Sequence, residues 1–136
     1  MTKENRESEI RDYVAYLDTV VSEVLATCVG LPEVHVLGFS QGAATASRWA
    51  ALGNVKPQRL ICWAGDIAHD LKQPAVSLAG TDLIVVHGSR DKLLTNKRKQ
   101  AFLDRMDADG LTYRLVSFEG GHRMDTDTLA GLVAAP

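Results

Sequence analysis

The chain has 136 residues, and its 15 lysines and arginines against 17 aspartates and glutamates leave a formal net charge of -2. This balance argues against nucleic acid or an anionic membrane as the main partner, because both select a basic excess. Apolar runs are too short to span a bilayer, and residues 1–9 are too polar for a secretory signal peptide. We therefore expect a single domain over residues 1–136 in a cytoplasmic protein.

The first predicted element is an amphipathic helix that ends before Gly30 and Pro32. Its apolar residues recur at steps of four and three, which places them on one stripe: Ile10, Val14, Leu17, Val21, Val24 and Cys28. Cys28 and the second cysteine, Cys62, both lie among apolar residues and lack the spacing of metal ligands. We therefore expect two buried, reduced thiols.

Short apolar segments rich in β-branched residues predict four strands, at residues 34–39, 59–64, 82–86 and 112–118. Helix-forming residues between or after them predict further helices at residues 43–52, 97–106 and 126–134. Residues 66–81 favour a loop with one helical turn at most, because Pro74 interrupts it. Strands that alternate with helices and are apolar on both faces indicate an α/β fold, with a mostly parallel sheet of about four strands flanked by helices.

The sequence Gly38-Phe39-Ser40-Gln41-Gly42 lies between a predicted strand and a predicted helix. This G-x-S-x-G pattern is typical of a tight turn that raises the serine hydroxyl above the sheet, at the positive end of the helix. We expect both glycines to be needed, because a side chain at either position would clash. The alternative is an ordinary glycine-rich turn with a capping serine.

A serine hydroxyl acts as a nucleophile only with a base, and the base needs an acid that orients it. Asp91 follows the third predicted strand and His122 follows the fourth. The carboxyl ends of parallel strands meet at one edge of the sheet, where ligands bind. Ser40, Asp91 and His122 also occur in the chain order of α/β-hydrolases, so we predict that they form a catalytic triad.

Other residues compete for these roles. Asp66 and Asp125 are rival acids, but each fits the expected position less well than Asp91, and Glu119 is expected to be solvated. His87 ends a strand before a glycine, and His35 lies inside the strand that precedes the G-x-S-x-G turn. We expect both histidines to be structural, because a packed histidine is more common than a catalytic one at such positions.

The loop after the second strand carries Asp66, His69 and Asp70, which together resemble a metal site. Such a polar loop is more often solvated, so we expect no metal there. The basic run at residues 97–99 is expected to form the solvated face of its helix. Trp63 and Leu93 are candidates for the substrate pocket, although core packing suits Trp63 better.

Four segments together resemble the phospholipase/carboxylesterase branch of the α/β-hydrolases, which includes the acyl-protein thioesterases: 38–43, 63–65, 87–91 and 121–122. The resemblance runs from the first helix to the end of the chain. It implies that Ser40 is the nucleophile, His122 the general base and acid, and Asp91 the orienting acid. It also implies an oxyanion donor in the backbone N–H of Gln41, and hydrolysis of carboxylic esters or thioesters without a metal or cofactor.

The chain departs from that family at its start. Family members carry further strands and a His-Gly-rich oxyanion loop before the helix that opens this sequence. The second oxyanion donor therefore has no counterpart, and the loss of one such donor typically costs about 10²–10³ in rate. The strand at 34–39, which is central in the family, is expected at an edge of the sheet here.

An apolar edge strand invites pairing with another chain. Three arrangements are open: a homodimer through strand 34–39, a partner chain that supplies the N-terminal half, or a covering element of this chain such as its first helix. We expect a homodimer or a higher oligomer that covers this edge.

Together these features predict a serine carboxylesterase that acts on small-molecule carboxylic esters through an acyl-enzyme on Ser40. Short-chain esters are favoured because the predicted site is small and open. The alternative is a non-catalytic or weakly active hydrolase fragment that folds by association with another chain. A peptidase or a dienelactone hydrolase would use similar machinery, although the dienelactone enzymes have cysteine where this chain has serine.

Overall fold

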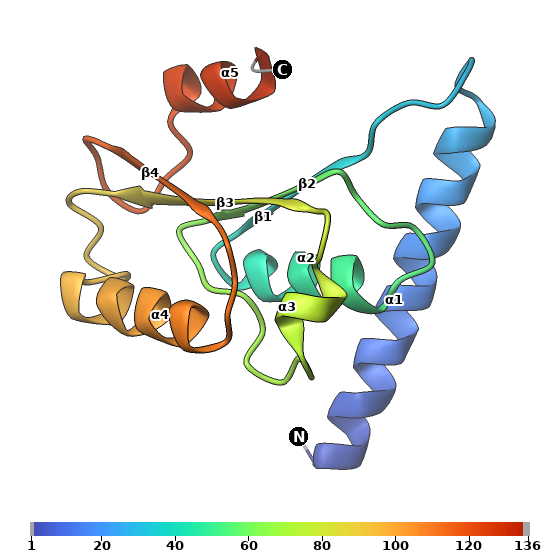
Figure 1. Ribbon diagram of the computed structural model, residues 1–136, viewed down its shortest axis with the longest axis horizontal. Helices are drawn as coiled ribbons and strands as arrows, with labels where there is room; N and C mark the ends of the chain where they lie inside the picture. Colours follow the sequence, from blue (N-terminus) through green and yellow to red (C-terminus); the bar gives the residue numbers. More distant parts are fainter. Residues whose placement is uncertain (1, 135–136) are drawn as a thin grey trace.

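The structure, a computed structural model, describes residues 2–134, which form helices and strands in alternation (Figure 1). In chain order the elements are α1 (Lys3–Ala26), β1 (His35–Phe39), α2 (Gln41–Leu52), β2 (Arg59–Trp63), α3 (Pro74–Ser77), β3 (Asp82–Gly88), α4 (Asn96–Ala108), β4 (Arg114–Phe118) and α5 (Thr126–Ala134). This is the order that the sequence predicts. The single helical turn expected in the loop at 66–81 is α3, and it begins at Pro74, since proline is tolerated in the first turn of a helix.

The strands form one parallel sheet in the order β1-β2-β3-β4. Near their C-terminal ends, Phe39 pairs with Trp63 and Trp63 pairs with Val86. Because the strands are in register there, the loops that follow them meet at one edge of the sheet. The predicted α/β class with about four parallel strands is confirmed, and this edge carries Ser40 together with the loops after β3 and β4.

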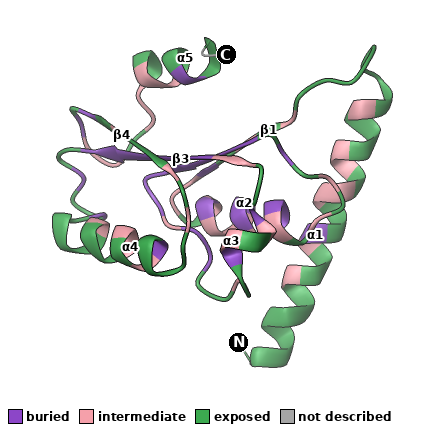
Figure 2. Ribbon diagram, in the orientation of Figure 1, coloured by how far each residue is buried: buried purple, intermediate pink, exposed green. Residues whose placement is uncertain are grey.

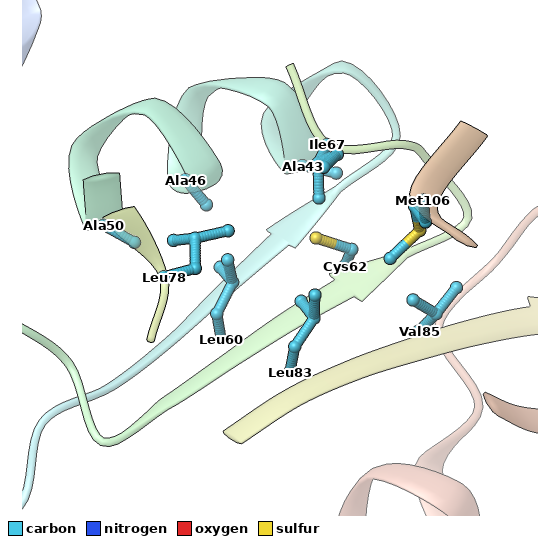
Figure 3. Packing of buried hydrophobic residues seen from close by; sticks show 10 residues of the cluster. All are labelled: Ala43, Ala46, Ala50, Leu60, Cys62, Ile67, Leu78, Leu83, Val85 and Met106. Carbon is cyan, nitrogen blue, oxygen red and sulfur yellow. The ribbon is translucent and has the colours of Figure 1, made fainter. Parts of the chain in front are cut away.

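Helices cover the two faces of the sheet unequally, with α2, α3 and α4 on one side and α5 on the other (Figure 1). Small alanines let α2 approach the sheet closely, and they pack with larger side chains of the strands and of α4 (Figure 3): Ala43, Ala46, Ala50, Leu60, Cys62, Leu83, Val85 and Met106. The cluster on the other face contains Trp63, Ile84, Val86, Phe118 and Leu132. As a result β3, which lies between the two clusters, is almost wholly buried (Figure 2).

α1 packs against α2 and uses only part of its apolar stripe. Val14 is buried, whereas Val24 is 56% exposed. The Asp18 carboxylate attaches the helix, because one of its oxygens accepts hydrogen bonds from the Trp49 indole N–H at 3.0 Å and from the Asn54 N–H at 2.9 Å. The predicted helix is therefore present, with much of its surface in solvent (Figure 2).

The two cysteines are free thiols in different surroundings. Cys62 is buried between α2 and the sheet, and burial raises the pKa of its thiol to about 12. Cys28 is exposed just beyond the end of α1, so the expectation that both thiols are buried is wrong. The physical reason is that α1 extends past α2, which leaves the end of its apolar stripe in solvent.

β1 lies at an edge of the sheet, as the sequence predicts. It pairs with β2 on one side, and no other strand within residues 2–134 pairs with its second side. Leu37, in the middle of β1, is 37% exposed. Pairing of this edge with another chain remains a prediction. Between residues 2 and 134, none of the helices combines the length and the hydrophobicity that a membrane span requires.

Candidate active site

Ser40 is the single residue between β1 and α2, and its backbone is strained. Its φ of 57° and ψ of -121° lie in a region that costs a residue with a side chain about 1–3 kcal/mol. Two hydrogen bonds hold the turn, because the Ser40 N–H donates to the Trp63 carbonyl at 2.8 Å and the Ser40 carbonyl accepts from the Ala43 N–H at 3.1 Å. The serine thereby lines a cavity at this edge of the sheet.

Close backbone contacts around this turn require glycine at positions 38 and 65, whereas the sequence predicted positions 38 and 42. A Cβ on Gly38 would overlap the carbonyl of Gly42, and a Cβ on Gly65, just after β2, would overlap the carbonyl of Ser40. A Cβ on Gly42 would meet no atom within 4 Å. The expectation that Gly42 avoids a clash is therefore wrong, because a side chain there would project from the first turn of α2 into open space.

Three side chains from three different loops form one hydrogen-bonded chain. His122 Nε2 lies 3.0 Å from Ser40 Oγ, and His122 Nδ1 lies 2.7 Å from Asp91 Oδ2. An ionised carboxylate only accepts hydrogen bonds, so Nδ1 carries the proton and donates a hydrogen bond to Asp91. Nε2 is then free to accept from the Ser40 hydroxyl. The structure thus brings the three predicted residues together, while their catalytic roles remain predictions.

The Asp91 side chain is fully buried, yet both of its oxygens have hydrogen-bond donors. Oδ1 accepts from the backbone N–H of Leu93 at 2.9 Å and of Leu94 at 2.8 Å, and Oδ2 accepts from His122. Burial alone would raise the pKa of this carboxyl, but the Leu94 N–H, His122 and the Leu93 N–H together lower it below its usual value. Asp91 therefore stays ionised at neutral pH and orients the imidazole.

Trp63, a candidate for the substrate pocket, lies in the core next to the His122 loop. Its side chain is fully buried and packs on Phe118, with ring centroids 5.7 Å apart. Its indole N–H donates to the carbonyl of Arg123, the residue after His122, at 2.9 Å. The pocket assignment for Trp63 is wrong, because the side chain lies on the face of the sheet that α5 covers.

A cavity of about 450 Å³ opens onto the Ser40 side chain. Gln41 and His122 line it, and so does Leu93, the other pocket candidate, which is 62% exposed. Gln41 begins α2, so its backbone N–H is one of the first donors of the helix, which have no acceptor within the helix itself. The role of this N–H as an oxyanion donor stays a prediction.

The cavity also has lining residues that were not singled out from the sequence, chiefly Arg6, Arg48 and Phe102. Helical spacing could have revealed two of them. Gln41 and Arg48 lie seven residues apart on one stripe of α2, and Arg98 and Phe102 lie four apart on α4. Arg98 was expected in a solvated basic run. It is exposed, as expected, and it also lines the cavity, where its Nη1 donates to the Leu93 carbonyl at 2.7 Å.

The rival carboxylates are engaged elsewhere or lie in solvent. Asp125 accepts hydrogen bonds from the N–H and hydroxyl of Thr128 at the start of α5. Glu119 is exposed. Asp66 pairs with Arg105, and its side chain is only 6% exposed. The expectation that this part of the loop is solvated is therefore wrong for Asp66, because an ion pair holds it inward.

The remaining histidines lie outside the hydrogen-bonded chain. His87 on β3 is buried, and burial together with the nearby Lys99 lowers its pKa to about 4. His35 is exposed at the start of β1. His69 contacts Asp66 at 2.9 Å. Within residues 2–134 there is no group of three or more histidine, cysteine or carboxylate ligands that could hold a metal ion.

Comparisons with known proteins identify the family of the chain. The family model described as "Serine hydrolase (FSH1)" matches residues 2–128. The chain belongs to the FSH1 serine hydrolase family. None of the curated proteins matches the chain.

Solved structures share the fold of this FSH1 family member. A carboxylesterase from Mesorhizobium loti has a TM-score of 0.70 at 21% identity, over 93% of this chain and 62% of that one. SOBER1 from Arabidopsis thaliana has a TM-score of 0.68 at 20% identity, over 93% and 62%. Acyl-protein thioesterase 2 from Zea mays has a TM-score of 0.63 at 20% identity, over 88% and 61%. The predicted resemblance to these α/β-hydrolases is confirmed, and the chain spans about 62% of their length.

Proposed function

We propose that this FSH1 serine hydrolase is a carboxylesterase in which Ser40 is the nucleophile, His122 the general base and acid, and Asp91 the orienting acid. The proposal rests on the hydrogen-bonded chain from Asp91 Oδ2 through the imidazole to Ser40 Oγ, with contacts of 2.7 and 3.0 Å. Membership of a serine hydrolase family supports hydrolysis as the type of reaction. We further propose that it acts on small-molecule esters in the cytoplasm.

In the first half of the proposed reaction, Ser40 Oγ attacks the carbonyl carbon of the ester while His122 Nε2 takes the hydroxyl proton. Asp91 stabilises the imidazolium that forms, because its carboxylate already accepts the Nδ1 proton. The tetrahedral intermediate then collapses as His122 Nε2 gives its proton to the leaving alcohol. The alcohol departs, and the acyl group remains on Ser40.

In the second half, a water molecule enters from the cavity that Ser40 and His122 both line. His122 Nε2 removes a proton from this water as its oxygen attacks the acyl carbonyl. The second tetrahedral intermediate expels Ser40 Oγ, which recovers its proton from His122, and the carboxylic acid leaves. The cycle balances with one ester and one water consumed.

The negative charge of each intermediate would form next to the first turn of α2. The Gln41 N–H is one donor for it, and the positive end of the helix dipole adds to its effect. The family resemblance places a second donor on a loop for which residues 2–134 offer no counterpart. With one donor, kcat is expected to be about 10²–10³ lower than with two.

A weakly active hydrolase unit that needs another chain is therefore the second candidate function. The observation that favours it is the edge position of β1, which is the strand that ends at Ser40. A chain that paired with this edge could bring a donor to the same end of the sheet. The two candidates share the same triad and differ in how much activity the chain has alone.

Short-chain carboxylic esters are the proposed substrates. The cavity of about 450 Å³ is of the size that small ligands occupy, and the exposed Leu93 leaves it open to solvent. Thioesters are alternative acyl donors, because the same attack on a carbonyl carbon releases a thiol in place of an alcohol.

A fluorophosphonate probe tests the proposal, because it reacts rapidly only with a serine that a base activates. Intact-mass spectrometry of the whole chain is expected to show one stoichiometric adduct, which is lost in the Ser40→Ala variant. No adduct on folded protein would contradict the carboxylesterase proposal and favour the second candidate. Labelling that appears only after a partner chain is added would decide for an assembled site.

A further inference from the structure

The cavity at Ser40 is positively charged, although the chain as a whole has a formal charge of -2. The charged side chains that line it, or that pair with a lining residue, are four arginines and three aspartates: Arg6, Arg48, Arg98, Arg105, Asp66, Asp70 and Asp91. These side chains therefore have one positive charge in excess. Such a local excess is a feature that attracts anionic ligands.

Asp66 and Arg105 neutralise one another and do not contribute to this excess. The Asp66 side chain is 6% exposed and forms an ion pair with Arg105. It also accepts hydrogen bonds from the Ile67 N–H at 2.8 Å and from His69 Nε2 at 2.9 Å. With its oxygens occupied by these donors, Asp66 is committed to the loop that follows β2. The excess positive charge therefore comes from the other three arginines, Arg6, Arg48 and Arg98.

Arg48 is held in a fixed position. It shares Asp70, its only carboxylate partner within residues 2–134, with Arg6. Its side chain is 14% exposed, its Nε donates to Asp70 at 3.0 Å, and its Nη1 donates to the Tyr13 hydroxyl at 3.2 Å. Arg6 contacts the second oxygen of Asp70 at 3.3 Å. Burial disfavours the charge on Arg48, but Asp70 and Tyr13 outweigh it and raise its pKa. A guanidinium has five N–H donors, so Arg48 keeps donors for a ligand.

Arg98 has no carboxylate partner within salt-bridge distance among residues 2–134. Its Nη1 donates to the Leu93 carbonyl at 2.7 Å, and its guanidinium lies 5.9 Å from the centre of the Phe102 ring. These contacts position the group without neutralising it. Arg98 is thus a placed cation on the wall of a cavity that also contains Ser40.

We propose that the ester substrates of this site carry an anionic oxygen group, a carboxylate or a phosphate, that Arg48 and Arg98 bind while the ester lies at Ser40. The inference rests on the proposed function, since it names the substrate class of the same site. The planar guanidinium fork matches both kinds of anion. Arg48 lies seven residues beyond Gln41 on α2. That spacing is a rise of about 10 Å, so the anionic group is expected several bonds from the scissile carbonyl.

Binding is measured first without turnover, in the Ser40→Ala variant. Monomethyl suberate, whose free carboxylate is ionised, and dimethyl suberate, which is neutral, differ by one methyl group. We expect the monoester to bind at least about fivefold more tightly by NMR titration, with a preference that shrinks as salt screens the charges. A phosphate-terminated analogue of equal length, titrated in parallel, shows which anion binds more tightly.

A matched pair of variants on α4, each made in the Ser40→Ala background, locates the effect. Arg98→Met removes a cation from the cavity wall, and Lys97→Met removes the same charge from the preceding residue, which is exposed and is not a lining residue. We expect Arg98→Met to reduce the anionic-to-neutral preference about fivefold and Lys97→Met to leave it unchanged. Arg98→Lys is expected to retain part of the preference, because it keeps the charge and loses the planar fork.

Turnover by the chain with Ser40 intact tests the same preference independently, as the ratio of kcat/KM for an anionic ester to that for a neutral ester. The 4-nitrophenyl monoester of suberic acid is expected to exceed 4-nitrophenyl octanoate in kcat/KM by about tenfold, as charge-assisted hydrogen bonds in a partly buried site would produce. Equal affinity of the two methyl esters, or a preference that Lys97→Met lowers as much as Arg98→Met, overturns the anion site. Absence of a fluorophosphonate adduct instead contradicts the esterase proposal. The titrations distinguish a failed esterase proposal from a failed anion site, because they measure binding in a variant that lacks the Ser40 hydroxyl.

Discussion

Trp63 and Arg123 are joined by a hydrogen bond of 2.9 Å from the indole N–H to the backbone carbonyl, which ties the loop that carries His122 to the core. Trp63 also supplies the carbonyl that accepts the Ser40 N–H at 2.8 Å. One buried residue of β2 therefore contacts both the turn that holds the serine and the loop that holds the imidazole. Packing in the core thereby sets the distance between the proposed nucleophile and its base.

Trp63→Phe tests this positioning role. The change leaves the Arg123 carbonyl without its donor and is expected to destabilise the fold by about 1–3 kcal/mol. We expect kcat for a 4-nitrophenyl ester to fall at least about tenfold with little change in KM, because the His122 loop loses its attachment. Trp49→Phe is the control, since Trp49 is also buried and donates to Asp18 at 3.0 Å from another part of the fold. A similar loss of kcat in both variants would contradict the role.

Gly42→Ala and Gly65→Ala are expected to differ in a direction that the G-x-S-x-G pattern does not suggest. A Cβ on Gly42 meets no atom within 4 Å, and Gly42 lies in α2, so alanine is expected to keep or raise stability, by at most about 1 kcal/mol. A Cβ on Gly65 overlaps the Ser40 carbonyl, so alanine there is expected to cost about 1–3 kcal/mol and to disturb the turn. Urea unfolding of both variants decides between the two expectations, and the reverse order would refute them.

Asp91→Asn tests whether the carboxylate sets the imidazole tautomer. An asparagine side chain can donate to Nδ1, which moves the proton to Nε2 and removes the acceptor for the Ser40 hydroxyl. We expect kcat to fall by about 10⁴, the effect of the same change in a Ser-His-Asp triad. Asp125→Asn, which replaces a carboxylate that instead contacts Thr128, is expected to change kcat less than about threefold. A mild effect of Asp91→Asn on folded protein would require another orienting acid.

His87 is expected to make the fold sensitive to acid. Its pKa is lowered to about 4 by burial and by Lys99, from an ordinary value of 6.5, so the folded chain keeps it neutral while the unfolded chain takes up a proton. Stability is therefore retained above pH 6.5 and lost as the pH falls towards 4, by about 3 kcal/mol in full. His87→Gln should flatten this part of the stability curve, whereas His35→Gln, at an exposed position, should not. An unchanged slope in His87→Gln would show that other groups cause it.

The edge of β1 predicts self-association. Among residues 2–134 no second strand pairs with β1, and its Leu37 is partly exposed. Such an edge is a template for a strand from another chain, and we expect a second copy of this chain to supply that strand. Light scattering at micromolar concentration is expected to give the mass of a dimer, and Leu37→Lys is expected to lower it to that of a monomer. A stable monomer for the unmodified chain would end the homodimer prediction.

Local sequence determined most of the architecture. Apolar periodicity and β-branched runs predicted the strands and the long helices, because side-chain spacing alone decides which face can be buried. The G-x-S-x-G turn and the positions of Asp91 and His122 after later strands predicted which residues meet, since parallel strands end at one edge. These predictions depend on the spacing of apolar residues, on the order of the motifs and on the parallel topology, all of which can be inferred from the sequence.

Packing decided what remained. Trp63 lies in the core, Cys28 lies in solvent and Gly65 instead of Gly42 approaches the turn, because each depends on which neighbour arrives from a distant segment. The positive charge of the cavity wall also depends on residues from distant segments. Its arginines come from α1, α2 and α4, so no local pattern could show that they face one space or that Arg98 has no carboxylate partner among residues 2–134. The sequence alone determined which groups the protein has for the proposed acyl transfer, and the tertiary structure decided which charges surround them.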